Sequence, residues 1–425
     1  MSRLSGSEVN ERGPALLVPL GSVSFRRFWA GASLSMLADQ ALLVSLTWLV
    51  VRTTDSGTAL GFVLAVASIP GIVLTPLGGV LSDRLPPTYV MSVVSVARAA
   101  LMGVLAILVL TDATRIWHVY LLAGGLSALD ALYYPASLSV APTLLDPDRL
   151  KAANALTQGV EQISGVLGPA SAGLLLALFG LWAGLGVNAV LFLISALIFA
   201  AVTRAVPPAT NNSQEADEGE TAHVEDADTL SALLEGARYV WGDPVIRTIM
   251  LILVGINLSM AGPVYVGGSL LAETRLGGAG AFGTLIAAAG AGALVGAVLA
   301  GSLGRMRRRG LIQLASTAVI GVGVGGFAFA PNLLVVVLLS AVVGMTASFM
   351  AVVNISWLQE LSRPGLTSRV MSLAMFSTIA LDPISYMLAG AIVELSLPAV
   401  FLAAAGLLLL TAVLGATSRT MRTAD

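Results

Sequence analysis

Residues 28–51 read FWAGASLSMLADQALLVSLTWLVV, an apolar run that contains one carboxylate, Asp39. A bilayer core needs about 20 apolar residues in a helix that rises about 1.5 Å per residue, so this run is long enough to cross a membrane. A charge at bilayer depth costs about 2.5–3.5 kcal/mol on insertion scales, and such residues are usually functional. The run therefore predicts a membrane-spanning helix that carries a functional acid.

The composition extends this interpretation to the whole chain. Of the 425 residues, 56% are hydrophobic and 11% are charged, whereas soluble domains carry about 25% charged residues. There is no cysteine, and the two histidines are far apart in the sequence. We therefore expect no disulfide, metal site or cofactor. No nucleophile–base pair or Walker-type loop is present, so we expect neither an enzyme nor an ATP-driven pump, and no nucleic-acid partner.

Apolar runs of this length predict an all-α integral membrane protein with twelve transmembrane helices. The predicted spans are 28–51, 58–81, 88–110, 117–140, 154–178, 181–203, 246–270, 280–303, 311–330, 333–357, 370–393 and 397–416. The predicted divisions are a cytoplasmic N-terminal segment (1–27), a six-helix half (28–204), an acidic linker (205–245), a second six-helix half (246–416) and a cytoplasmic tail (417–425).

The basic residues orient these spans. Of the 22 Lys and Arg residues, Arg52, Arg115 and Arg275 fall on one side, Arg98 falls within a span, and the rest fall on the other side. Because basic loops stay in the cytoplasm, we expect both termini and the linker to be cytoplasmic. The first apolar run is too long for a cleavable signal, so we expect a multi-pass protein of the inner membrane that keeps its N-terminus.

The linker is acidic and polar, which is typical of a solvated, flexible connection. Within it, the residues from Leu230 to Trp241 are more apolar and predict a short helix on the membrane surface.

The two predicted halves contain similar signals in the same order. Gly79 to Arg84 follows the second span, and Gly301 to Arg305 follows the eighth. In the same register, Gly168-Pro169 of the fifth span corresponds to Asp382-Pro383 of the eleventh. Such repetition is expected of a secondary transporter built from a duplicated unit.

Gly79 to Arg84 resembles the helix 2–3 signature of the major facilitator superfamily, Gly-x-Leu-x-Asp-Arg, although Pro86-Pro87-Thr88 replaces its usual basic ending. The resemblance implies a conformational latch made by Gly79, Asp83 and Arg84. Asp83 would pair with Arg369 or with the N-terminal dipole of the eleventh helix; the alternative is a generic polar turn.

Ser164 to Gly173, centred on Gly168-Pro169, partly resembles the superfamily's helix 5 antiporter signature. The resemblance and the Pro imply a hinge at Gly168 and Pro169, and ordinary small-residue packing is the alternative. Strings such as Phe25 to Trp29 resemble the branch with macrolide and tetracycline efflux proteins and the enterobactin exporter. That branch implies proton-driven export of a lipophilic or amphipathic molecule.

Five charged residues lie within the spans. The superfamily fold implies that Asp39 and Asp130 face a central cavity, so both are candidates for proton coupling. Asp39 could instead form a structural ion pair with Arg98, and Asp130 could bind a cationic substrate or simply face the inner vestibule. Arg98 needs an acidic partner, and the sequence leaves Asp39 and Asp130 as alternatives.

The other two charges are candidates of a different kind. Glu161 could take part in proton coupling, but pairing near the cytoplasmic gate is favoured. Asp382 is also a candidate for proton coupling; because it precedes Pro383, where a carboxylate and a freed carbonyl could mark a hinge, a structural role is the equal alternative.

A last set of candidates would line the substrate cavity, although most aromatic and Met residues serve packing or lipid contact. They are Tyr133, Tyr134, Asn257, Met260, Met345, Phe349, Asn354 and Trp357.

Together these features predict a proton-coupled antiporter that exports lipophilic or amphipathic small molecules, such as drugs, by alternating access. We expect a monomer whose partners are the bilayer, protons and its substrate. The alternatives are an exporter or flippase of a siderophore or lysolipid, and a uniporter with the same fold.

Overall fold

A computed structural model describes residues 15–205, 238–303, 308–362 and 366–417, with the backbone alone at 75–84. In this part of the chain every regular element is a helix, and 11 segments are long and apolar enough to cross a membrane. The remaining predicted span, 117–140, corresponds to α4 (Ile116–Leu144), which has the length but contains Asp130, three tyrosines and two prolines. The predicted all-α membrane fold is therefore confirmed.

The first half of the chain forms one bundle of six long helices. Its elements are the 3₁₀ helix η1 (Ala15–Gly21) and the α-helices α1 (Val23–Thr54), α2 (Gly57–Arg84), α3 (Pro87–Leu110), α4, α5 (Pro147–Phe179) and α6 (Leu181–Ala205).

The second half forms another bundle, in which some spans consist of several elements. These are α8 (Pro244–Gly262), the π-helical turns η2 (Pro263–Gly267) and η3 (Ala272–Leu276) with α9 (Gly268–Leu271) between them, α10 (Ala279–Ser302), α11 (Arg309–Gly326), the 3₁₀ turn η4 (Phe327–Phe329), α12 (Leu333–Leu361), α13 (Thr367–Ile379), α14 (Asp382–Val393) and α15 (Leu397–Thr417).

The helix starts follow from local sequence. Pro87, Pro147 and Pro244 each occupy the first position of a helix, where the missing N–H would have had no partner. The Asp243 carboxylate also accepts hydrogen bonds from the backbone N–H groups of Val245 and Ile246, at 2.8 and 3.1 Å. Asp243 thus caps the N-terminus of α8, and Pro244 is the first residue of this helix.

Two spans of the second half are not continuous α-helices. The seventh changes from α to π geometry at Pro263. The eleventh, which we predicted as one helix over 370–393, ends at Ile379 and starts again at Asp382. Because Pro383 has no N–H to continue the ladder, the interruption lies where the sequence places this proline.

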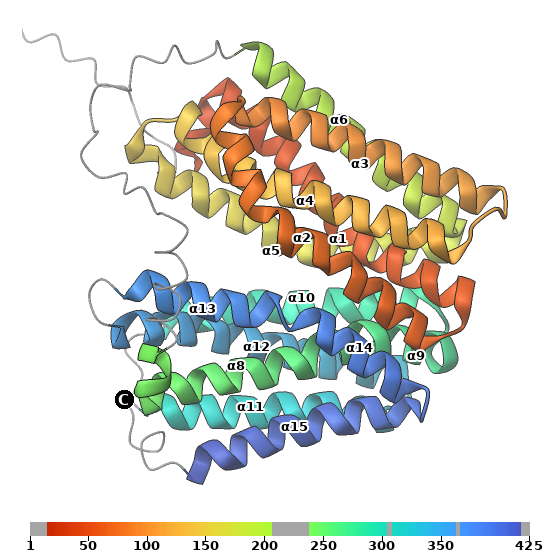
Figure 1. The fold of residues 1–425 in the computed structure, drawn as a ribbon, viewed down its shortest axis with the longest axis vertical. Helices are drawn as coiled ribbons and strands as arrows, with labels where there is room; N and C mark the ends of the chain where they lie inside the picture. Colours follow the sequence, from red (N-terminus) through yellow and green to blue (C-terminus); the bar gives the residue numbers. More distant parts are fainter. Residues whose placement is uncertain (1–14, 206–237, 304–307, 363–365, 418–425) are drawn as a thin grey trace, which may run out of the picture.

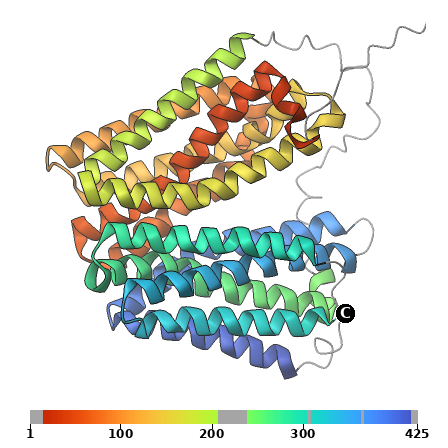
Figure 2. The same cartoon turned by 180° about the vertical axis from the view of Figure 1, so that it is seen from behind.

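The two bundles lie side by side, and their helix ends lie on the same two sides of the molecule (Figures 1 and 2). The ends of α6 and α15 and the start of α8 lie at this end, which we call the linker end. The α1–α2 turn and the end of α14 lie at the opposite end, which we call the distal end. The bundles approach each other at the distal end and lie further apart at the linker end (Figure 1).

Glycine makes this approach possible along two seams, α2 against α14 and α5 against α10. A Cβ added at Gly61 would lie 2.4 Å from the carbonyl oxygen of Tyr386, and one added at Gly283 would lie 2.5 Å from that of Pro169. Gly159 and Gly301, further along α5 and α10 toward the linker end, would meet nothing within 4 Å. The α5–α10 seam is therefore tight from the distal end to mid-length, and the two bundles diverge toward the linker end (Figure 1).

Most of the predicted linker, residues 206–237 with its acidic run, lies outside the described residues. The same holds for most of the surface helix predicted from Leu230 to Trp241, of which residues 238–242 are described and helical.

Candidate transport site

The first bundle brings three of the five predicted charges together at the middle of its helices. Asp39 lies on α1, Arg98 on α3 and Asp130 on α4, each near the centre of its helix. Because the three helices are neighbours, these side chains meet at one depth, far from both helix ends.

Arg98 contacts both carboxylates, so Asp39 and Asp130, which the sequence left as alternative partners, are both its partners. Its Nη1 lies 3.5 Å from Asp39 Oδ1 and 3.4 Å from Ser35 Oγ, one turn earlier on α1. Its Nη2 donates to Asp130 Oδ1. The guanidinium also stacks on the Tyr133 ring, 4.3 Å from its centroid, in a cation–π contact.

The three charged side chains differ in how much of their surface is exposed. The Arg98 side chain is 2% exposed, whereas those of Asp39 and Asp130 are 38% and 55% exposed. Phe192 of α6 also contacts the guanidinium, whose Cζ lies 5.5 Å from the centroid of the Phe192 ring. The cation therefore lies beneath two accessible carboxylates, and the ionised group of three carries one net negative charge.

The other two predicted charges lie elsewhere. Glu161 is exposed on α5, and Asp382 is half-buried at the first residue of α14. Within the described residues neither forms an ion pair. A role for either in proton coupling stays a prediction.

Of the predicted latch, Gly79, Asp83 and Arg84 fall in the last turns of α2, where the side chains lie outside the described residues. Arg369 is half-buried in the first turn of α13.

The predicted hinge residues Gly168 and Pro169 are buried within α5, which continues through them. A Cβ at Gly168 would lie 2.6 Å from Cβ of Gln40, so this glycine lets α5 pack against α1 beside Asp39. Pro383 lies at the start of α14, where the eleventh span is interrupted.

The predicted cavity residues divide by burial. Tyr134 is 58% exposed, and Asn257, Met260, Met345 and Phe349 are partly exposed. Tyr133, Asn354 and Trp357 are buried in this conformation, at 7%, 1% and 1% exposed. Contact of these residues with a substrate stays a prediction.

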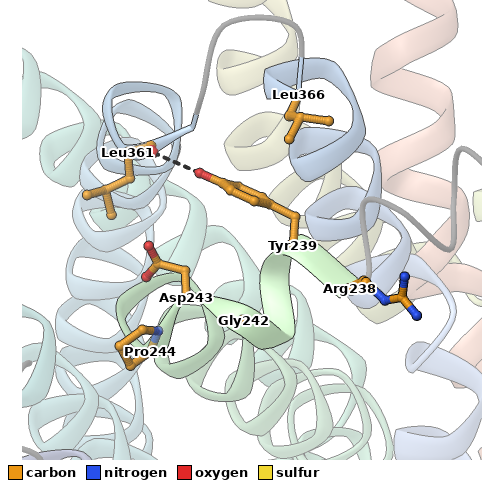
Figure 3. Close-up of a pocket in the computed structure, with 7 residues that line it drawn as sticks. All are labelled: Arg238, Tyr239, Gly242, Asp243, Pro244, Leu361 and Leu366. Carbon is orange, nitrogen blue, oxygen red and sulfur yellow. Dashed lines mark hydrogen bonds between the residues drawn. The ribbon is translucent and has the colours of Figure 1, made fainter.

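A separate cavity of about 620 Å³ lies in the second bundle near the linker end (Figure 3). The Tyr239 hydroxyl donates to the Leu361 carbonyl oxygen at 3.3 Å. The lining residues are Arg238, Tyr239, Gly242, Asp243, Pro244, Leu361 and Leu366. None of the three central charges lines it.

Sequence reasoning missed three contacts of Arg98, with Ser35, Phe192 and Tyr133, the last of which we predicted only as a cavity residue. Ser35 stands four residues before Asp39, so helical spacing alone places both on one face of α1. Phe192 carries no such signal, because it is one of many large apolar residues in the sixth span.

Two bundles of six spans, tight glycine seams and a shared cluster of charges at mid-membrane depth define an all-α membrane transporter. A family model of the Major Facilitator Superfamily matches residues 28–381. The chain belongs to this superfamily.

Characterised relatives have similar length. The multidrug efflux pump Tap of Mycolicibacterium fortuitum is 25% identical over 409 residues, which cover 92% of each chain. Macrolide efflux protein A of Streptococcus pyogenes is 25% identical, over 83% of this chain and 87% of its own. The enterobactin exporter EntS of Escherichia coli is 25% identical, over 90% and 88%. These relatives support the branch that the sequence motifs indicated.

Solved structures share the fold at lower identity. The nucleoside transporter NupG superposes with a TM-score of 0.72 at 16% identity, covering 93% of this chain and 99% of its own. A bacterial homologue of the iron transporter ferroportin, solved in an inward-facing state, superposes with a TM-score of 0.66 at 20% identity, covering 93% and 99%.

Proposed function

We propose that this transporter is a proton-coupled exporter of lipophilic or amphipathic small molecules that works by alternating access in the cytoplasmic membrane. The observation that carries the proposal is the group of Asp39, Arg98 and Asp130. Two accessible carboxylates share one buried guanidinium at the depth where an ionised group is most costly. A purely structural ion pair would need only one of these carboxylates.

The charge of this site explains why transport would be an exchange. With both carboxylates ionised the group carries one net negative charge, and moving it through the hydrocarbon is unfavourable. Either one proton or one cationic group of a substrate neutralises it. Proton and substrate therefore compete for the same carboxylates. The site would change the side of the membrane to which it is open only when one of the two is bound.

The proposed cycle assigns different tasks to the two carboxylates. Asp130 is the more accessible and would receive the cationic group of a substrate. Asp39 would take up a proton from outside, which leaves Arg98 to pair with Asp130 alone and displaces the substrate. Met260, Met345, Phe349 and Tyr134 would supply an adaptable apolar surface around the ligand.

The conformation fits the stage at which substrate enters. The seams are closed at the distal end and open toward the linker end. If the linker is cytoplasmic, as the arginine distribution predicts, this is the inward-facing state. One chain contains both halves of the site, so we propose the monomer as the transport unit.

The names of the relatives support export of drugs, and that of EntS supports a siderophore as the second candidate substrate class. Proteoliposomes with an imposed pH gradient separate the two. We expect a lipophilic amine to be transported along with counterflow of protons, and the Asp39→Asn variant to lose this coupling. Transport of a catecholate siderophore with no response to amines would favour the second class.

A further inference from the structure

Two polar contacts join the bundles at the distal end. Arg52, in the last turn of α1, pairs with Glu273 of η3 across 3.2 Å. Glu394, directly after α14, accepts hydrogen bonds from Ser56 Oγ at 3.0 Å and from the backbone N–H of Thr58 at 3.2 Å. Both contacts connect residues more than 200 positions apart in the sequence.

The contact of Glu394 is a helix cap supplied by the opposite bundle. Gly57 and Thr58 form the first turn of α2, whose N–H groups have no partner within their own helix. A carboxylate at a helix N-terminus satisfies these donors and interacts favourably with the helix dipole. The Thr58 hydroxyl lies 3.2 Å from both Glu394 Oε1 and the carbonyl oxygen of Gly390. We call Glu394 with Ser56 and Thr58 the distal clasp.

The distal clasp depends on direct contact between the backbones of α2 and α14. A Cβ added at Gly390 would lie 2.8 Å from the carbonyl oxygen of Gly57, so α2 and α14 touch directly at this level. Glu394 follows α14 by one residue, and Ser56 precedes α2 by one residue. If the bundles part at the distal end, the carboxylate moves away from α2 and the cap is lost.

We propose that the distal clasp, assisted by the Arg52–Glu273 pair, holds the distal gate closed and sets the share of molecules in which this gate is open. The proposal rests on the alternating access proposed above, because only a molecule that opens at this end has to break the clasp. It assigns Glu394 a role in the conformational equilibrium, away from the site that binds substrate.

The ionisation of Glu394 makes the clasp persistent. The hydrogen bonds from the Thr58 backbone and the Ser56 hydroxyl hold the pKa of Glu394 below its ordinary range. A lowered pKa means that the clasp's contribution is present above the ordinary pKa and is lost as the pH falls through the lowered one. Asp55 lines the adjacent cavity of about 200 Å³ together with Glu394 and Thr274, and no cation is among its lining residues. Because its pKa is lowered by these hydrogen bonds, Glu394 should stay ionised at neutral and mildly acidic pH.

Distance measurements between spin labels test the proposal without a known substrate. The chain has no cysteine, so labels can be placed freely. The pair Ala113→Cys and Leu334→Cys, exposed at the distal ends of the two bundles, reports the distal gate. The pair Lys151→Cys and Ser302→Cys reports the linker end. We expect Glu394→Gln to raise the distal-open population about fivefold, since a cap of this kind has about that effect, and to shorten the linker-end distance in the same molecules.

The matched control is Asp112→Asn, which neutralises an exposed carboxylate in the distal α3–α4 turn, within one bundle. It should leave both distance distributions unchanged. A charge reversal, Arg52→Glu with Glu273→Arg, should restore the closed gate that either single reversal weakens.

Three results would contradict the proposal. A distal distance that lengthens in Glu394→Gln with no change at the linker end would show that the two gates are not coupled. If the distal gate of the wild type opens between pH 8 and pH 5 but Glu394→Gln has the same distance distribution as the wild type, the role of the clasp is contradicted while alternating access stands. If neither wild type nor variant moves at any pH, alternating access fails, and the clasp fails with it.

Discussion

Arg98 is the residue on which the proposed mechanism depends. Its guanidinium is buried, stacks on Tyr133 and is shared by Asp39 and Asp130. Removing a buried partner of an ion pair is costly chiefly because it leaves the opposite charge without compensation. Here two carboxylates would remain, both partly accessible, so the loss is smaller than for fully buried charges.

We expect Arg98→Met to lower the stability by about 1–3 kcal/mol, less than the full cost of an isolated buried charge. Thermal unfolding of the purified protein in detergent measures this loss. The triple variant with Asp39→Asn and Asp130→Asn should recover most of the stability, because it removes the unpaired charges. A triple variant less stable than Arg98→Met would show that the carboxylates do not need their cation.

Part of this cluster was predictable from the sequence. Charges within otherwise apolar spans identify Asp39, Arg98 and Asp130 as functional candidates. The sequence did not predict that Arg98 bridges both carboxylates, because this depends on the rotation of α3 relative to α1 and α4. The clasp residue Glu394 was missed because it lies just beyond a span, where a carboxylate needs no explanation.

At the scale of elements, the seventh and eleventh spans are joined where both are irregular. The Ser385 hydroxyl accepts a hydrogen bond from the Gly262 N–H and donates one to the Leu258 carbonyl oxygen, both at 2.8 Å. In a regular α-helix these two backbone groups would bond each other. The hydroxyl of α14 thus bonds both backbone groups of one helical hydrogen-bond position of α8, directly before the π turn at Pro263.

The variant Ser385→Ala should lower the stability by about 1–3 kcal/mol, because it leaves two buried backbone groups without their partner. Hydrogen exchange of the peptide around Gly262 should become faster, which a loss of stability elsewhere would not produce. Ser377→Ala is the matched control, since the Ser377 hydroxyl donates to the Leu373 carbonyl oxygen of its own helix. Equal effects of the two variants would argue against this role of Ser385.

The seam between α5 and α10 gives a second prediction at this scale. In Gly283→Val, the new Cβ would lie 2.6 Å from Cα of Gly173, and overpacking of this kind costs about 1–3 kcal/mol. We expect a lower unfolding temperature and a larger distal distance between the labelled bundles. Gly301→Ala, where nothing lies within 4 Å, should change neither.

Helix positions were easier to predict than their interruptions. Each predicted span corresponds to a helical segment because length and apolar content suffice to define it. The break between Ile379 and Asp382 could be anticipated from Pro383, and we placed a candidate hinge there. The π turns could not be predicted, since they depend on packing between α8 and α14 that no local pattern encodes.

At the scale of the whole molecule, both the closed distal seams and the central charges belong to one functional description. Because the seams between the bundles are tight at the distal end, the central charges can be reached only from the linker end. The duplicated sequence signals predicted two halves, whereas which end is closed depends on contacts between residues far apart in the sequence. The conformation was therefore beyond prediction from the sequence.

The central claim is that proton and substrate exchange at the carboxylates beside Arg98. Everted membrane vesicles with an acidic lumen and a pH-sensitive dye test it directly, with a panel of lipophilic quaternary ammonium ions as added substrates, because these ions cannot carry protons across the bilayer by themselves. For wild type we predict that a transported ion dissipates the pH gradient, and that Asp39→Asn abolishes this response while an ionophore control still collapses the gradient. Uptake of the ion that persists with a protonophore present, and is unchanged in Asp39→Asn, would contradict the account.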